Sequence, residues 1–408
     1  MIDPGLPLDP LLIAALLSVA SAFAACAGLL ILQLGLQRVF SIAPSLASAP
    51  RGDLPDTSLC VVIPAYNEAD NIGPCLASVL ASDPPCRDWQ VLVVDDESSD
   101  ATTDRVTALL HDRSASDPPC RLLRAGARPP AERWVGKNWA CTRAMEEVSS
   151  NWVLFIDADV RLRPEALRRA LAQASGEEAD LFSLAPRLGC GCLAEWMVQP
   201  IMASLLGLGF PIEAANDPLS EVAFAAGPFM LFRRSAYESV GGHRALASEV
   251  VEDLALARCI KSSGFRLRYL LGLDAVDLRM YADLPALWEG WTKNWFIGLD
   301  RDVSRALGAA GVVVLMFSAP WLQFPAALVL LMLVPQLSIW WLALLGLSLL
   351  AIMQQLLLRF WQRRRFDVPL TYWWLMGAGG LLLGAIGPVS VWRTLTGRGW
   401  TWKGRQLS

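Results

Sequence analysis

The stretch "WVLFIDADV", residues 152–160, joins an apolar run to two aspartates, Asp157 and Asp159, that are one residue apart. The run is typical of a buried strand, and the aspartates follow where such a strand would end. Carboxylates this close repel each other unless a cation shares them. Hard divalent ions such as Mg²⁺ or Mn²⁺ prefer carboxylate oxygens, and Mg²⁺ takes its other ligands from water and substrate phosphates. Two nearby aspartates also occur in ordinary solvated loops. The residues around the pair are needed to distinguish a metal site from such a loop.

Three similar apolar runs precede this stretch, at residues 59–64, 91–96 and 120–125. Predicted helices lie between them at 71–81 and 100–110, and another follows Gly136. Near-continuous apolar strands that alternate with helices predict an α/β domain with a mostly parallel sheet buried on both faces. The active sites of such sheets lie at the carboxyl ends of the strands.

Polar residues follow the first two runs. "VIPAYNEADNI" places Tyr66 and Glu68 after the first strand, where Tyr66 fits either the edge of the core or a platform for a nucleobase. "VLVVDDESSD" ends the second strand in Asp95 and Asp96, whose carboxylates suit a base or a ribose. Asp100 is expected to cap the helix that follows.

Six stretches carry a family resemblance in their order and spacing: "VVIPAYNEADNI", "VLVVDDESSDAT", "WVGKNWA", "VLFIDADVRL", "GPFMLFRRSAYESVGG" and "VEDLALA". Together they resemble an inverting glycosyltransferase of family 2, whose GT-A domain binds a nucleotide-diphospho-sugar. The resemblance covers about residues 58–300. The membrane layout and "WVGKNWA" look most similar to hopene-associated and carotenoid glycosyltransferases.

The resemblance implies a role for each motif. Asp159 would hold Mg²⁺ or Mn²⁺, and Asp253 would act as the catalytic base with Glu252 beside it. Without the resemblance, these last two residues read as solvated acids that a helix N-terminus favours. The UDP- or GDP-sugar donor would be bound by Pro64, Ala65, Tyr66, Glu68, Asp95, Asp96, Lys137 and Asp157.

The chemistry agrees with these roles. A hydroxyl acceptor is a poor nucleophile, so a carboxylate must remove its proton during attack. Departure of a nucleoside diphosphate builds negative charge, which a divalent cation and Lys137 can neutralise.

The chain departs from polymerising members of the family, which carry Q-x-x-R-W after the base. Here "GWTKNWFIG", residues 290–298, has Trp291 and Asn294 at the Gln and Arg positions, which favours transfer of a single sugar. Trp291, Lys293 and Trp295 are candidates for closing over the donor, although tryptophans before a membrane span are also ordinary anchors. His243 is a candidate for touching substrate or an ordinary loop histidine.

Composition indicates a membrane protein. Of the 408 residues, 54% are hydrophobic and 17 are Trp. After residue 305 the basic residues outnumber a single acid, Asp367, although the whole chain carries −4, so the acidic excess lies earlier. An acidic domain joined to a basic, apolar tail does not suggest nucleic-acid binding. The nine cysteines, without a CxxC pair, suggest free thiols. Two histidines exclude a multi-histidine metal site.

Residues 11–36 are long and apolar enough to span about 30 Å of hydrocarbon. No basic residue precedes them, which argues against a signal peptide, and Arg38 and Arg51 follow. The positive-inside rule then places the N-terminus outside and the catalytic domain in the cytoplasm of a bacterial-type membrane. We expect a transmembrane helix within residues 1–38, a linker at 39–57 and the GT-A domain at 58–305.

Residues 306–408 form a predicted C-terminal membrane region with two to three spans and a basic tail. Residues 306–358 are uncharged and predict a hairpin of two spans with a break near Pro320 and Pro325. Residues 370–392 either cross the membrane, the preferred interpretation, or re-enter it, which Pro388 and the glycines at 377–380 would tolerate inside protein.

The apolar segment at 192–210 reads as a core helix or, by preference, as a helix at the membrane surface beside the entrance for an acceptor. The sequence thus predicts a membrane-bound, non-processive glycosyltransferase that moves one hexose to an isoprenoid lipid, such as a carotenoid, a hopanoid or a polyprenyl phosphate. A glycerolipid or sphingolipid acceptor is the first alternative. A non-catalytic membrane scaffold is the second.

Overall fold

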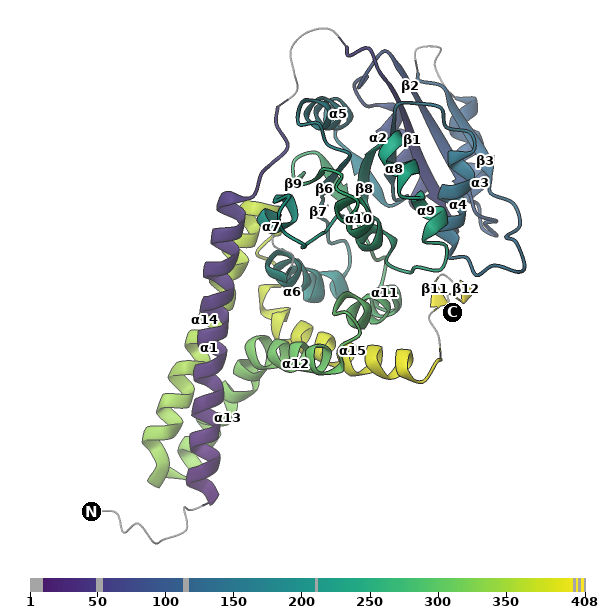
Figure 1. The fold of residues 1–408 in the computed structure, drawn as a ribbon. Coiled ribbons are helices and arrows are strands. Elements are labelled where there is room, and N and C mark those ends of the chain that lie inside the picture. Colours follow the sequence, from purple (N-terminus) through teal and green to yellow (C-terminus); the bar gives the residue numbers. More distant parts are fainter. Residues whose placement is uncertain are drawn as a thin grey trace.

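The computed structural model describes residues 10–48, 54–112, 117–209, 212–398, 401–402 and 405–406. It consists of an α/β head and a helical stem (Figure 1). The N-terminal helix runs the length of the stem, and the chain then enters the head. Residues 39–42 belong to this helix rather than to a linker. Ser45 then bridges to Leu271 of the head, and Arg169 donates to the carbonyls of Leu46 and Ala47. The predicted linker is therefore partly ordered against the head.

A seven-stranded sheet forms the centre of the head, in the order β3-β2-β1-β4-β8-β6-β9. Its first four strands along the chain match the predicted apolar runs and are parallel, as predicted. β8 runs antiparallel to β4 and β6, so the sheet is mixed. The bounds are β1 (Ser58–Ala65), β2 (Asp88–Asp95), β3 (Cys120–Arg124), β4 (Trp152–Ile156), β6 (Leu181–Ala185), β8 (Phe229–Arg233) and β9 (Leu267–Leu271).

A second sheet of three short strands follows the end of β4. Its order is β5-β10-β7, formed by Val160–Leu162, Val276–Leu278 and Arg187–Leu188. Asp157 and Asp159 occupy the turn between β4 and β5, so both sheets fix their position. A further hairpin of β11 (Thr401–Trp402) and β12 (Arg405–Gln406) lies near the C-terminus.

Helices cover both faces of the main sheet, which buries its strands as the apolar runs predict. Asp100 accepts from the backbone N–H of Thr102, the first residue of α3, and so stabilises the start of that helix. The helices of the head are α2 (Ile72–Leu80), α3 (Thr102–His111), α4 (Gly136–Met145), α5 (Ala166–Gly176), α6 (Leu193–Gly209), α7 (Ile212–Asn216), α8 (Arg234–Ser239), α9 (Gly242–Ala245), α10 (Glu252–Ser262) and α11 (Leu284–Gly298).

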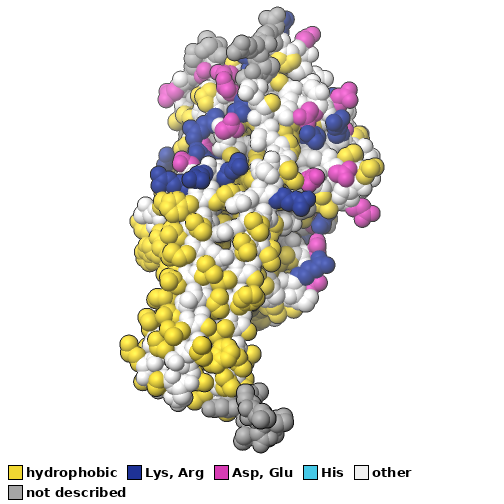
Figure 2. Space-filling view, turned by 90° about the vertical axis from the view of Figure 1, so that its left-hand side faces the viewer, with side chains coloured by type: hydrophobic (Ala, Val, Ile, Leu, Met, Phe, Trp, Pro, Cys, Tyr) yellow, Lys and Arg dark blue, Asp and Glu magenta, His cyan; other side chains and the backbone are white. Residues whose placement is uncertain are grey.

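The stem is formed by α1 (Pro10–Ile42), α13 (Ala319–Leu333) and α14 (Ser338–Phe366), and α14 packs against both of the others. Among the residues that the structure describes, four helical segments are long and apolar enough to cross a membrane: 10–42, 303–333, 335–366 and 373–395. Hydrophobic side chains cover the face of the stem seen in Figure 2, and Lys and Arg gather where the stem meets the head. α14 ends there in the exposed Arg363, Arg364 and Arg365.

The predicted break near Pro320 and Pro325 is wrong. The chain reverses further on, at the short 3₁₀ turn η2 (Pro335–Leu337). Near Pro320, α12 (Val303–Val313) passes through a π-helical turn, η1 (Val314–Ser318), into α13. Pro320 lies in the first turn of α13, directly after η1, and has no N–H to donate to the preceding turn. Nε2 of Gln355 in α14 donates instead to the carbonyl oxygens of Met316 and Phe317, at 2.9 and 3.1 Å.

The last predicted span corresponds to the 3₁₀ turn η3 (Trp373–Leu375) and α15 (Met376–Leu395). Figure 1 shows α12 and α15 lying crosswise to the stem helices, beneath the head. α15 packs on α12, α11 and α6. It therefore does not run alongside α1 and α14, as a crossing helix of the same bundle would.

Candidate active site

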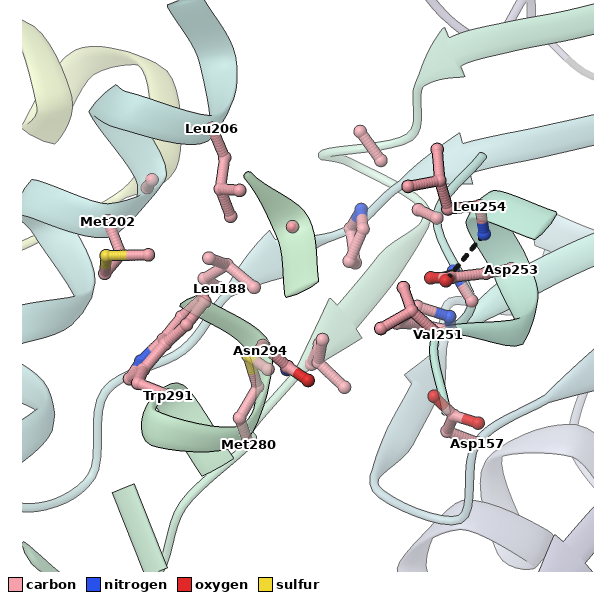
Figure 3. A pocket seen from close by; sticks show the side chains of 18 of the residues that line it. Asp157, Leu188, Met202, Leu206, Val251, Asp253, Leu254, Met280, Trp291 and Asn294 are labelled. Atoms are coloured by element: carbon pink, nitrogen blue, oxygen red, sulfur yellow. Dashed lines mark hydrogen bonds between the residues drawn. The ribbon is translucent and has the colours of Figure 1, made fainter. Parts of the chain in front are cut away.

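A single cavity of about 950 Å³ opens at the carboxyl ends of the parallel strands and continues toward the stem. It brings together residues from β1, the β4–β5 turn, α4, α6, α10, α11 and α12. Figure 3 shows its two ends: Asp157 and Asp253 lie on one side, and Met202 and Leu206 of α6 lie on the other. The cavity is lined by every candidate site residue from the sequence except Asp95 and His243.

The end of the cavity formed by β1 and β2 holds Pro64, Ala65, Tyr66, Glu68 and Asp96. These residues lie together because β1 and β2 are parallel neighbours whose ends share one sheet edge. The edge presents an aromatic ring, a proline and carboxylates around one opening, which suits a nucleoside.

Arg128 was not predicted from the sequence. Its Nη2 lies 2.5 Å from Oδ2 of Asp96, and Asp96 is only 2% exposed. The pair fixes the Asp96 carboxylate at the wall of the cavity. Arg128 stands in an irregular loop after β3, outside every motif, so no sequence signal identified it.

Asp95 holds a turn rather than lining the cavity. Its Oδ1 accepts from the backbone N–H of Ser98 at 3.2 Å. Asn67, in the left-handed region at φ 51°, accepts from the backbone N–H of Ser99 at 2.8 Å. These hydrogen bonds connect the loops after β1 and β2, and they fix the positions of Tyr66 and Asp96 relative to each other.

Lys137, in the first turn of α4, forms the electrostatic centre of the site. Its Nζ lies 2.6 Å from Oδ1 of Asp157 and 2.6 Å from Oε1 of Glu252. Burial lowers the pKa of Lys137, but the two carboxylates outweigh burial and hold this pKa well above its ordinary value. The lysine therefore carries its charge and joins the β4–β5 turn to the start of α10.

Asp253 differs from its neighbour Glu252 in its surroundings. Its Oδ2 accepts from the backbone N–H of Gly227 at 3.0 Å, and its Oδ1 accepts from that of Leu254 at 2.8 Å. A Cβ at residue 227 would lie 2.9 Å from Oδ2, so this approach requires glycine. Burial, and then the charge of Glu252, raise the pKa of Asp253 to about 6 despite Lys137.

Glu252 stays ionised beside it. Burial raises the pKa of Glu252, but the charge and hydrogen bond of Lys137 overcome this and place the pKa below its ordinary value. Two adjacent carboxyl groups with pKa values pushed apart are the arrangement expected of a base and its electrostatic partner.

Asp157 and Asp159 both line the cavity, in the turn between β4 and β5. Within the described ranges, no group of three or more His, Cys, Asp or Glu side chains is placed to hold a metal. The protein thus offers one or two carboxylates, a donor set that suits Mg²⁺ or Mn²⁺ whose other ligands are water and a diphosphate. Asp157 and Asp159 therefore suit a divalent ion that takes its remaining ligands from the substrate diphosphate and from water.

His243 lies in the core. It is 1% exposed, its Nδ1 lies 2.7 Å from Oη of Tyr237, and its backbone N–H donates to the same oxygen. Burial lowers the pKa of His243 to about 3, so the ring is neutral. His243 is therefore a buried residue of α9 and not a loop histidine, and it does not line the cavity. Its ring packs on Phe155 of β4.

The far part of the cavity is apolar. α6 contributes Met202, Leu205 and Leu206, and α12 contributes Ala309 and Val312. The helix predicted within 192–210 corresponds to α6 among the described residues, which buries one face against α1, α11 and α15 and lines the cavity with another. Its place at a membrane surface stays a prediction.

α11 lies between the two ends of the cavity. Trp291 donates to Oε1 of Gln199 at 2.9 Å, and Trp295 donates to the carbonyl of Ala306 at 3.1 Å. Both indoles are thus fixed by the protein. Lys293 also lines the cavity, and burial lowers its pKa while Glu252 opposes this shift. Asn294 projects into the space between the two ends (Figure 3).

All nine cysteines are free thiols, as predicted. Cys75 and Cys141 are buried close to the charged residues of the site, and burial raises their pKa values. These thiols are neutral packing groups and not nucleophiles.

Known proteins are similar to much of this chain. Residues 60–241 match the family "Glycosyl transferase family 2". The 4,4'-diaponeurosporenoate glycosyltransferase of Staphylococcus aureus strain MRSA252 is 26% identical over 261 residues, which cover 62% of this chain and 64% of that protein. The enzyme of the same name from strain USA300 is 26% identical over 251 residues, or 59% of this chain and 61% of its own length.

Among solved structures, a mannosyltransferase from Pyrobaculum calidifontis in complex with GDP-Man and Mn²⁺ is similar over 91% of this chain and 97% of its own, with 16% identity and a TM-score of 0.47. Glucosyl-3-phosphoglycerate synthase from Mycobacterium tuberculosis, in complex with Mn²⁺, UDP-Glc and phosphoglyceric acid, covers 61% of this chain and 83% of its own, with 20% identity and a TM-score of 0.38.

Proposed function

We propose that the chain, whose residues 60–241 match the family "Glycosyl transferase family 2", is a membrane-bound, inverting, non-processive member of that family that moves one hexose from a UDP- or GDP-sugar to an isoprenoid lipid. The observation that carries the proposal is the shape of the cavity. One continuous space joins the charged residues at the sheet edge to an apolar chamber beside the stem. A water-soluble donor and a lipid acceptor can therefore meet at Asp253.

The apolar chamber favours a lipid acceptor over a soluble one. Its walls come from α6, α12 and the end of α1, where Phe40 lines the cavity. Burying apolar surface contributes about 25 cal/mol per Å², so such a chamber binds a hydrocarbon chain and rejects a free sugar. The 26% identity with a carotenoid glycosyltransferase supports an isoprenoid among the possible lipids.

In the proposed reaction, the acceptor hydroxyl attacks the anomeric carbon of the donor sugar and Asp253 accepts the hydroxyl proton. The bond from the anomeric carbon to the nucleoside diphosphate breaks, and Lys137 neutralises charge on that leaving group. A divalent cation held at Asp159, with Asp157 nearby, would stabilise the same charge. A single displacement inverts the anomeric centre and requires no protein nucleophile.

The catalytic head is proposed to face the cytoplasm. Arg363, Arg364 and Arg365 lie in the last turn of α14, where the stem meets the head, and Arg38 lies just before the last turn of α1. Cytoplasmic flanks of membrane helices are enriched in Lys and Arg. Nucleotide sugars are available on that side.

The proposal is tested with the full-length protein in lipid nanodiscs, supplied with UDP- or GDP-hexoses and with Mn²⁺, Mg²⁺ or EDTA. Candidate acceptors are a hydroxylated carotenoid, a carotenoid carboxylic acid, a polyprenyl phosphate, a diacylglycerol and a ceramide. Mass spectrometry should show one added hexose on an isoprenoid, and NMR should show an inverted anomeric centre. Transfer only to diacylglycerol or ceramide would establish the glycerolipid or sphingolipid alternative. If the protein neither transferred sugar nor hydrolysed any donor, the remaining interpretation would be a non-catalytic membrane scaffold.

The rate of transfer is expected to depend on the ionisation of Asp253. Because the base must be deprotonated and its pKa is raised to about 6, kcat/KM should be constant above about pH 7 and fall tenfold per pH unit below about pH 6. Burial and the charge of Glu252 raise the pKa of Asp253, and Lys137 and the backbone N–H groups of Leu254 and Gly227 oppose this shift. A pH profile of transfer between pH 5 and 8.5 measures it, and a rate that does not change between pH 5 and 7 contradicts the assignment.

A bulky side chain in the apolar chamber should prevent binding of the lipid acceptor without affecting binding of the donor. Val312 of α12 is half exposed and lines the cavity, so Val312→Trp places an indole in the chamber. We expect transfer to fall at least about tenfold, because the indole occupies space that the acceptor chain would fill and a misfit of one methylene in an apolar pocket already costs about 1–3 kcal/mol. Donor binding should stay unchanged. Leu307→Trp is the matched control, since Leu307 is 43% exposed on α12 and outside the cavity lining. Equal losses in the two variants would exclude the chamber as the acceptor site.

A further inference from the structure

α6 contains a proline, and this proline creates a gap in the helical hydrogen bonds. Pro200 lies inside α6 and has no N–H to donate to the carbonyl of Trp196, four residues earlier. A buried carbonyl without a donor is unfavourable. The structure supplies one from another helix: Nη2 of Arg359, in α14, donates to the oxygen of Trp196 at 3.3 Å.

Arg359 is an unusual residue for this position. Its side chain is 0% exposed, and no carboxylate among the described residues forms an ion pair with it. Its Nε and Nη1 have no hydrogen-bond partner in the described part of the chain. Burial of a cation without a counter-ion is expensive, and among the described residues the hydrogen bond to the Trp196 carbonyl on α6 is the one that its side chain makes.

A second contact from α14 lies one turn further on. Nε2 of Gln362 lies 2.7 Å from the carbonyl oxygen of Pro200 and 2.9 Å from Oγ of Ser204. On another side, α15 approaches α6 so closely that a Cβ at Gly379 would lie 2.1 Å from the carbonyl oxygen of Met197. The proline turn of α6 is thus held by α14 and α15 together.

The same helix forms one wall of the apolar chamber. Met202 and Leu206 follow Pro200 on α6 and line the cavity, and Gln199 accepts from Trp291 of α11. By contrast, Lys137 and Asp253 lie on α4 and α10. A shift of α6 therefore moves the acceptor end of the cavity and leaves the donor end in place.

We propose that Arg359 is a positioning residue: it replaces the donor missing at Pro200, fixes α6 against α14, and so sets the shape of the acceptor chamber. This inference rests on the proposed function, because it assigns the chamber to the acceptor. Arg359 lies outside the cavity lining. Its effect passes through α6.

The test is a double-mutant cycle on the full-length protein in nanodiscs, with donor binding and transfer measured separately. Arg359→Met should raise the acceptor KM about tenfold, because it leaves the Trp196 carbonyl without a donor. The kcat at saturating acceptor and the donor Kd should change less than twofold. Arg364→Met, an exposed arginine on the same helix, is the matched control and should change none of the three.

The effect of Arg359→Met is then measured again in a protein that also carries Pro200→Ala. Alanine restores the N–H to Trp196, so in this background Arg359→Met should raise the acceptor KM less than about threefold. An equal effect of Arg359→Met with and without Pro200 would overturn the inference, as would an equal loss of donor affinity. If the wild-type protein transfers sugar to no lipid, the proposed function fails instead. The thermal stabilities of the four proteins would then still report whether Arg359 and Pro200 are coupled.

Discussion

Asp253→Asn is expected to lower transfer at least about a hundredfold while leaving donor binding intact. A positioned general base contributes about 10²–10⁴ to a rate, and an amide cannot accept the hydroxyl proton. The fold should survive, because the raised pKa shows that the surroundings of this carboxyl group tolerate its uncharged form. Turnover and donor affinity measured separately on the same nanodisc preparation give the comparison.

Asp300→Asn is the control for this experiment. Asp300 lines the same cavity but is exposed, and it pairs with Arg258 at 3.1 Å. We expect its substitution to change transfer less than threefold. If Asp253→Asn retained a third or more of the activity, Asp253 would not be the base, and Glu252 would be the next residue to test.

Lys137→Met is expected to reduce transfer at pH 7 by about a hundredfold or more and to weaken donor binding. Removal of one preorganised charge from a developing anion costs about 10²–10³ in rate. The same substitution removes the cation that lies 2.6 Å from both Asp157 and Glu252, which leaves two partly buried carboxylates facing each other.

A second effect separates Lys137 from a residue that only binds the donor. Lys137 lowers the pKa of Asp253, so its loss should raise that pKa above about 6 and move the acid limb of the pH profile to higher pH. Lys137→Arg keeps the charge and should restore much of the acid limb. A loss of donor affinity in Lys137→Met with an unmoved pH profile would contradict the link between Lys137 and the base.

Much of the head could be predicted from local sequence. The run at 152–156 forms β4 within the predicted limits, and the acids at 157, 159 and 96 all reach one cavity. This follows because parallel strands bring their carboxyl ends to one edge of a sheet, so a polar residue after each strand is enough to place it there.

Other features could not be predicted in this way. The reversal between α13 and α14 falls at Pro335 rather than Pro320, because a uniformly apolar stretch has no periodic mark at its turn. The antiparallel β8 depends on which strands pair, and α15 lies crosswise because of its partners α6, α11 and α12. His243 became a core residue through Tyr237, which its motif did not reveal.

The sequence by itself determined the strands, the apolar segments, and the carboxylates and lysine of the site, because each of these depends on residues close together in the chain. Only the tertiary structure decided that Lys137 joins Asp157 to Glu252, that Arg128 holds Asp96, and that Arg359 completes α6. Most of these partners are separated by tens to hundreds of residues. Their contacts depend on how helices and sheets pack, and packing leaves no periodic pattern in one chain.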